Sequence, residues 1–176
     1  MSELKVLDVE SNREKVSEIV SLAEKLQELC SELGFNAFQP GAIKELKTAT
    51  ILGHDWIRSK AQADACSDGG KLLYEYLSAA EGGSGQIDRV FRDGPGKNRE
   101  KHLKSMRRIS RNEAFFLVYT DKDPTRPLDI LRIYRVPTSE IEKEAVRKLS
   151  VSKNDISHLG FDENFAKAHG KLVFGN

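Results

Sequence analysis

The chain has 176 residues, which is enough for one domain with a hydrophobic core of its own. Its 28 lysines and arginines nearly balance 27 acidic residues, so the net charge of +1 indicates no partner by itself. The two cysteines, Cys30 and Cys66, fit neither a disulfide framework nor a zinc site. The acidic N-terminus does not resemble a signal peptide, and no segment has the apolar length of a membrane span. We therefore expect a soluble, globular, intracellular protein that has no membrane partner.

Two helices are predicted within residues 10–52. Apolar residues recur at helical spacing from Val16 to Leu33, on a segment whose opposite face is densely charged. A helix with such a stripe packs on a core or on a second copy of the chain. A shorter helix is expected to begin near Pro40 and to end at Leu52.

A β-hairpin is predicted next, because the strand-like runs DWIRSKAQADA and KLLYEYLSA flank the turn sequence CSDGG. We centre the turn on Asp68 and Gly69, which places Asp64 opposite Leu73. Asp64 and Glu75 are then diagonal neighbours on one face, at roughly 7–8 Å between backbone positions.

Two carboxylates at this separation repel each other unless a cation lies between them or one takes up a proton. Mg²⁺ prefers such a site, with water and substrate phosphate as the remaining ligands. Lys60 and Lys71 fall on the same face, where they could orient water or neutralise charge on a phosphate. In the alternative interpretation, Asp64 begins a turn and Glu75 pairs with an arginine from a neighbouring element.

A basic helix is predicted over residues 96–111, after a glycine-rich loop at residues 81–86. Like charges four residues apart destabilise a helix by about 0.2–0.5 kcal/mol per pair, a cost that adjacent phosphates would offset. We therefore predict phosphate contacts, although a solvated surface would also accommodate the charges. The cations concerned are Lys97, Arg99, Lys101, Lys104, Arg107, Arg108 and Arg111. Candidates for reading bases are His102, Arg99, Gln86 and Arg89.

The rest of the chain predicts two strands, AFFLVYT and LDILRIYRV, then a helix from Pro137 to Leu149 and a tail with a short helix and a strand. This order is typical of an α+β or mixed α/β domain, with one central mixed sheet and flanking helices. We expect a single domain over residues 1–176, without a linker.

Several motifs, in this order along the chain, resemble the PD-(D/E)XK nuclease superfamily and, within it, the PvuII family of type II restriction endonucleases. The stretch LGFNAFQPGAIKEL is similar to a Phe-Gln segment of that family, and ADA with YEY is similar to its metal-binding hairpin. A histidine-containing segment around His102, the strand pair FFLVY and ILRIYRV, and the ending AHGKLVF complete the resemblance, which spans about residues 20–174.

The resemblance implies a homodimer that holds double-stranded DNA and uses Mg²⁺ to hydrolyse phosphodiester bonds at a palindromic site, in the cytoplasm of a bacterium or archaeon. Asp64 and Glu75 take the metal-ligand positions, and Lys60 or Lys71 would assist catalysis. The dimerisation region would be residues 10–52, the catalytic sheet and basic helix residues 53–136, and the C-terminal helix and tail residues 137–176.

The chain departs from the family pattern at two positions. Leu77 stands where a lysine is expected, and Pro40 replaces an acidic residue after the Phe-Gln pair. The role of the lysine could have moved to Lys60 or Lys71, the metal could suffice without it, or the protein could bind DNA without cutting it. A dimeric interaction protein, whose basic helix binds an acidic partner, is a further alternative.

Overall fold

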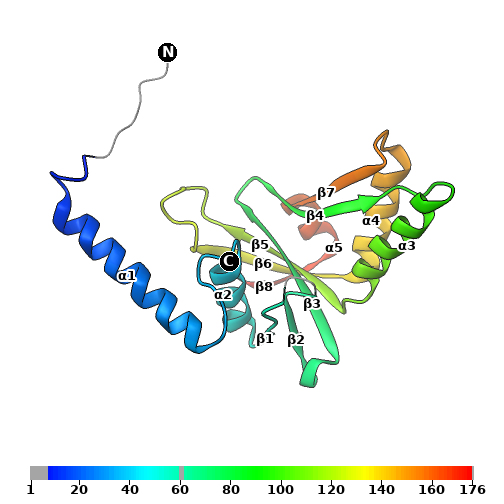
Figure 1. Ribbon diagram of the computed structural model, residues 1–176. Coiled ribbons are helices and arrows are strands. Elements are labelled where there is room, and N and C mark those ends of the chain that lie inside the picture. Colours follow the sequence, from blue (N-terminus) through cyan, green and yellow to red (C-terminus); the bar gives the residue numbers. More distant parts are fainter. Residues whose placement is uncertain (1–7, 60–61, 176) are drawn as a thin grey trace, which may run out of the picture. The chain divides into compact units, whose positions relative to one another are not determined.

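The computed structural model describes residues 8–59 and 62–175, although not the side chain of Lys97. The chain divides into two compact units, Met1–Ile43 and Lys44–Asn176. Over the described residues it forms five α-helices, a six-stranded mixed sheet and a separate two-stranded sheet, which makes the protein α+β (Figure 1). None of the described helices combines the length and the apolar character that crossing a membrane requires.

The first unit consists mainly of α1 (Arg13–Glu32), which confirms the first predicted helix. Cys30 is the only buried residue of this helix. Large apolar side chains along α1 and at its end are instead exposed: Ile19 by 64%, Leu22 by 60%, Leu26 by 39%, Leu29 by 51% and Leu33 by 62%. The predicted apolar stripe is therefore present and lies largely in solvent.

The main sheet of the second unit has the strand order β1-β2-β3-β5-β6-β8. Its strands are β1 (Asp55–Trp56), β2 (Ala65–Ser67), β3 (Leu72–Ala80), β5 (Ala114–Thr120), β6 (Ile130–Pro137) and β8 (Lys171–Phe174). The β3–β5 pair is parallel and the other pairs are antiparallel. The connection from β3 to β5 contains β4 (Ser84–Phe91) and α3 (Lys97–Ser110), which confirms the predicted basic helix.

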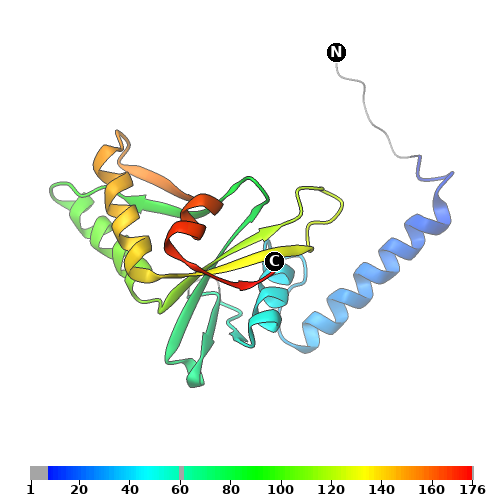
Figure 2. The same ribbon diagram turned by 180° about the vertical axis from the view of Figure 1, so that it is seen from behind.

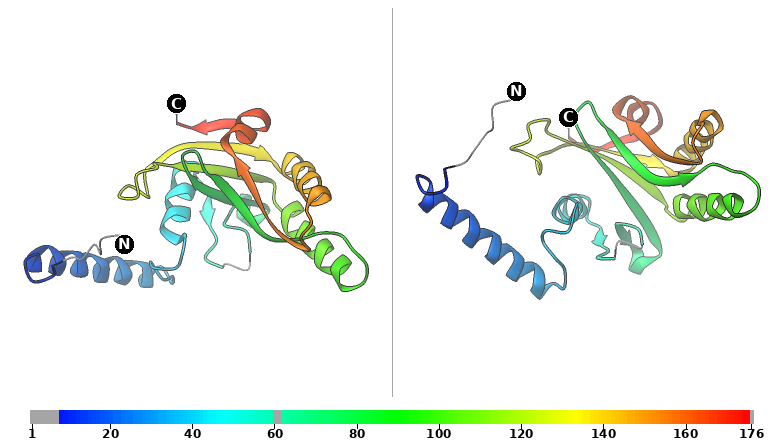
Figure 3. Two further views of the ribbon diagram at one scale, coloured as in Figure 1. Left: turned by 90° about the horizontal axis from the view of Figure 1, so that it is seen from above. Right: turned by 45° about the horizontal axis from the view of Figure 1, so that its top comes forward.

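Both faces of this sheet are covered, so every residue of β5 is buried. On one face, α4 (Thr138–Val151) and α5 (Glu163–His169) pack on β5 and β6, as Figure 2 shows. On the other face lies α2 (Ala42–Leu52), with Ala49, Ile51 and Leu52 packed against the sheet. Figure 3 shows α2 and α5 on opposite sides of the sheet.

Two predictions about the strands are wrong. A second sheet accompanies the predicted one, because β4 pairs antiparallel with β7 (Ile156–Asp162), and β4 begins inside the segment predicted as a loop. The predicted strand from Asp55 to Ala65 is interrupted, and its ends form β1 and β2, which pair with each other. Lysine and alanine, which occur in the middle of this segment, are depleted in strands.

Candidate active site

The turn of the hairpin that carries Asp64 and Glu75 contains more residues than predicted. Ser67 pairs with Leu72, so the turn contains Asp68 to Lys71. Asp68, Gly69 and Gly70 have φ values of 49°, 64° and 89°, and the two glycines accept this left-handed backbone readily. The strands are consequently paired two residues away from the predicted register. A shift of two residues keeps each side chain on its predicted face.

In the observed register Asp64 lies closer to Glu75 than in the diagonal arrangement that the sequence predicted. The Asp64 backbone N–H donates to the carbonyl oxygen of Tyr74 at 3.0 Å. Oδ2 of Asp64 accepts from the backbone N–H of Tyr76 at 2.8 Å. Asp64 therefore contacts β3 on both sides of Glu75, which places the two acidic residues next to each other.

Glu75 is an unfavourably placed carboxylate, because it is buried beside a second acidic group. Its Oε2 atom is buried and has no hydrogen-bond partner among the described residues. Burial, followed by the negative charge of Asp64, raises the pKa of Glu75 to about 8. Arg111 and Arg108 act in the opposite direction, yet neither forms an ion pair with Glu75 in the described part of the chain. The described residues therefore do not form the ion pair between Glu75 and an arginine that the alternative interpretation predicted.

Asp64 and Glu75 are the residues of this region that could hold a metal ion. Within residues 8–59 and 62–175, no group of three or more histidine, cysteine, aspartate or glutamate residues could hold a metal ion. Mg²⁺ typically binds one or two carboxylates and keeps its other positions for water and phosphate. The buried, unpartnered oxygen of Glu75 beside Asp64 is the kind of atom that such an ion would satisfy.

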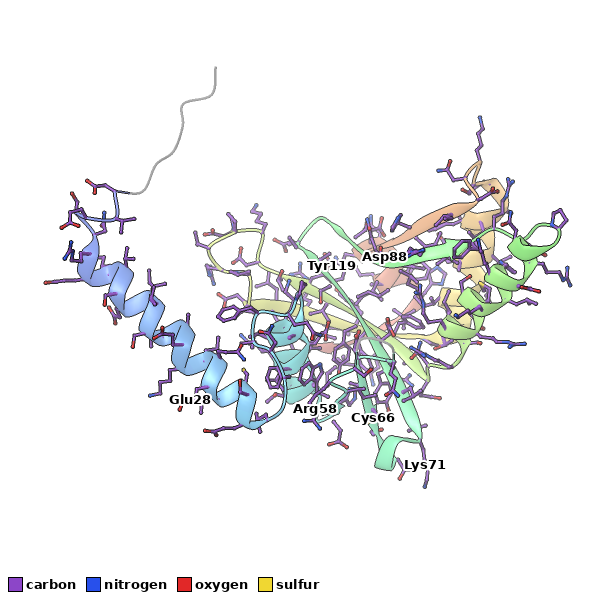
Figure 4. All side chains as sticks on the ribbon, viewed as in Figure 1. Glu28, Arg58, Cys66, Lys71, Asp88 and Tyr119 are labelled. Carbon is purple, nitrogen blue, oxygen red and sulfur yellow. The ribbon has the colours of Figure 1, made fainter. Side chains whose placement is uncertain are left out.

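Of the two lysines proposed to assist the carboxylate pair, only Lys71 belongs to the described residues. Lys60 lies outside the described residues. Lys71 lies at the tip of the hairpin, exposed, with its Nζ 3.2 Å from Oδ2 of Asp68 (Figure 4). Leu77 is buried in the core with Ile87 and Val90, so this position contributes packing and no cation.

A groove of about 650 Å³ lies between α3 and β4. Its charged lining residues are all basic: Arg89, Lys101, Lys104, Arg107, Arg108 and Arg111. No ion pair with an acidic residue is formed by these six side chains among the described residues. The groove therefore concentrates positive charge that the protein itself does not neutralise, which favours an anionic ligand.

A β-bulge directs one of these cations into the groove. The register of β4 against β7 shifts between Ile87 and Val90, and Arg89 within the bulge has a φ of 52°. This left-handed backbone is uncommon for a residue with a side chain. Asp88, labelled in Figure 4, is held at the same bulge, where its Oδ1 lies 2.7 Å from Nδ1 of His158.

The remaining predicted DNA contacts lie elsewhere or are already bonded. Nδ1 of His102 is 2.7 Å from the carbonyl oxygen of Phe91, and Arg99 lies 3.8 Å from Asp93. Gln86 is exposed on β4 and is absent from the groove lining. The side chain of Lys97 lies outside the described residues.

Comparison of the sequence with models of known protein families gives no match, and comparison with curated proteins gives none either. The carboxylate pair and the groove are therefore the features from which a function can be inferred.

Proposed function

We propose that the protein is a Mg²⁺-dependent, site-specific endonuclease with a restriction-endonuclease-like core, which cleaves double-stranded DNA at a palindromic site as a homodimer. One observation carries this proposal. Arg108 and Arg111 line the basic groove and also act electrostatically on Glu75, so the surface suited to a phosphate chain adjoins the carboxylate pair. This relation supports a proposal in which DNA bound in the groove is hydrolysed at the carboxylate pair.

Each part of this region has a chemical task in the proposed reaction. Asp64 and Glu75 would hold Mg²⁺, which when bound polarises a phosphodiester and lowers the pKa of water. The groove cations would bind DNA phosphates and so supply affinity without sequence preference. Arg89, Gln86, Arg99 and the Nε2 atom of His102 are the candidates for contacts to base edges.

The direct test is incubation of the protein with a DNA mixture and Mg²⁺, followed by gel electrophoresis. We expect discrete fragments from the wild type and none from Asp64→Ala. Intact DNA with a salt-sensitive mobility shift would contradict hydrolysis and support a binding protein. Intact DNA without a shift at low salt would contradict both, and would leave an acidic protein as the partner.

The second candidate function is DNA binding without cleavage, and the burial of Leu77 favours it. Leu77 is 5% exposed, and β4 passes so close that a Cβ atom on Gly85 would lie 2.7 Å from the Cβ of Leu77. A lysine has no room to reach the carboxylates from this position without disturbing the core. If cleavage depends on a cation beside the metal, a residue other than the one at position 77 must supply it.

The homodimer part of the proposal is supported by α1. Ile19, Leu22, Leu26, Leu29 and Leu33 follow one another at alternating spacings of three and four residues, and all are exposed. This spacing is the a/d pattern of helices that pair along their length. A second copy of α1 would cover the stripe, and a twofold dimer would match a palindromic DNA site.

We predict that Leu26→Lys converts the protein from dimer to monomer, because it places a charge in the middle of the stripe. The expected result in analytical ultracentrifugation is a dimer for the wild type and a monomer for the variant. Glu28→Lys, a change of an exposed residue of the same helix outside the stripe, is the matched control and should remain dimeric. A monomeric wild type at micromolar concentration would refute the pairing of α1 helices.

A further inference from the structure

We infer that Arg111 is a catalytic residue that stabilises the negative charge on the phosphoryl group during hydrolysis. This inference rests on the proposed nuclease function and identifies the cation that position 77 does not supply. It assigns the role to α3, an element outside the hairpin that holds the carboxylates.

The fold places Arg111 beside β3. It is the C-cap of α3 and directly precedes β5, which runs parallel to β3 with Glu75 paired to Phe115. The backbone N–H of Glu113 donates to the carbonyl oxygen of Leu73 at 2.8 Å, which fixes the start of β5 against β3. Ile109, the last buried residue of α3, belongs to the same core cluster as Leu77. The end of α3 therefore lies over the face of the sheet that carries Glu75.

Arg111 and Arg108 differ in how they are held. The guanidinium group of Arg108 donates to the carbonyl oxygen of Asp88, which fixes its position. The side chain of Arg111 forms no hydrogen bond or ion pair with the described residues, and it lines the groove. Arg111 and Arg108 both lower the pKa of Glu75, and Arg111 has the larger effect. Arg111 therefore lies at the end of α3, beside β3, and its side chain is able to bind a phosphate in the groove.

The reaction gives this cation a defined task. The oxygen of a water molecule forms a bond to phosphorus, and the bond from phosphorus to a sugar oxygen breaks. That oxygen leaves with the electron pair and takes a proton from solvent, while the attacking water loses a proton to solvent. The phosphoryl oxygens carry the extra negative charge between these events. A guanidinium group binds them through two hydrogen bonds, and it stays charged, so it acts as an electrostatic stabiliser and not as a base.

The test compares Arg111→Gln with Arg107→Gln. Both residues line the groove, but Arg107 is not among the charges that act on Glu75. With full-length protein and a cleavable DNA, Arg111→Gln should lower kcat by about 100-fold or more at saturating DNA. Arg107→Gln should mainly raise KM, with kcat changed by less than about fivefold. Arg111→Lys keeps the charge and should recover part of the lost kcat, and thermal unfolding will confirm that each variant is folded.

A second readout does not depend on cleavage. Arg111→Gln and Arg107→Gln should both keep the Mg²⁺-induced thermal stabilisation of the wild type, because neither residue is a proposed metal ligand, so a lower kcat of Arg111→Gln would not reflect loss of the metal. If the wild type cleaves DNA but Arg111→Gln changes kcat no more than Arg107→Gln does, or if only Lys60→Gln loses kcat, the inference is wrong and the nuclease proposal survives. If the wild type does not cleave, the proposed function fails and the inference fails with it.

Discussion

Replacing Glu75 by glutamine is expected to stabilise the metal-free protein and, at the same time, to abolish cleavage of DNA. Both effects have one physical origin. The wild type keeps an ionisable group next to another carboxylate, and one of its buried oxygens has no hydrogen-bond partner among the described residues. Glutamine has nearly the same shape but no charge, so it removes the repulsion from Asp64 and also the metal ligand.

The stability effect depends on pH in a definite direction. The pKa of Glu75 is about 8 in the folded protein, against an ordinary value near 4.5, so the folded state binds more protons between these values. Folding stability therefore falls as pH rises through this range, by up to about 1.4 kcal/mol per pH unit. The stability of Glu75→Gln does not fall in this way, because glutamine does not ionise. Its advantage in free energy of unfolding should be small at pH 4.5 and on the order of 3–4 kcal/mol at pH 8.5.

Urea unfolding of metal-free protein at these two pH values measures the effect. Glu142→Gln removes a carboxylate of α4 that forms no ion pair with the described residues, and it is the control for loss of one negative charge. Mg²⁺ should stabilise the wild type and the control but not Glu75→Gln. Cleavage by Glu75→Gln should fall by at least about 1000-fold, since a metal ligand supplies several kcal/mol of transition-state stabilisation. Equal stability of variant and wild type at pH 8.5 would show that Glu75 is not unfavourably placed.

The carboxylate pair was predictable from sequence because side chains in a strand alternate with a period of two. The register assumed for the hairpin is wrong by two residues, since the turn holds Asp68 to Lys71 and not two residues alone. Asp64 and Glu75 nevertheless stay on one face. The same rule predicted the face of Leu77, but it could not tell that β4 crosses this position and buries it.

Only one wall of the basic groove, the helix α3, could be predicted from the sequence. The cations of α3 appear in sequence as a charged run, and the structure confirms the helix. The other wall required β4, whose pattern is broken by Gly85 and by the bulge at Asp88 and Arg89. Its partner β7 is distant in sequence, so the two-stranded sheet could not be predicted from a local sequence pattern. Likewise, the placement of Arg111 beside β3 follows from the parallel pairing of β5 with β3, a long-range contact.

Removing two cations from the groove is expected to weaken DNA binding strongly, and the salt dependence should identify the reason. Lys104 and Arg107 both line the groove, and neither forms an ion pair with the described residues. Each phosphate contact releases counterions from DNA, which contributes about 0.9 to the slope of log affinity against log salt concentration. Lys104→Gln/Arg107→Gln should therefore reduce that slope by nearly 2. The charge reversal Lys104→Glu/Arg107→Glu should weaken binding by about 100-fold or more at moderate salt, because it adds repulsion to the lost attraction.

A matched control separates this local effect from the change in net charge. Lys143 and Arg147 lie on α4, are 73% and 64% exposed, and pair with Glu140 and Glu144 respectively. Lys143→Gln/Arg147→Gln removes the same charge from the molecule but none from the groove. Fluorescence anisotropy with a labelled duplex, in Ca²⁺ or EDTA so that no cleavage occurs, should show a normal slope for this control. Equal slopes for the groove variant and the control would mean that DNA does not lie in the groove. A reduced slope for the groove variant alone would place the phosphate chain beside Arg111, which lines the same groove.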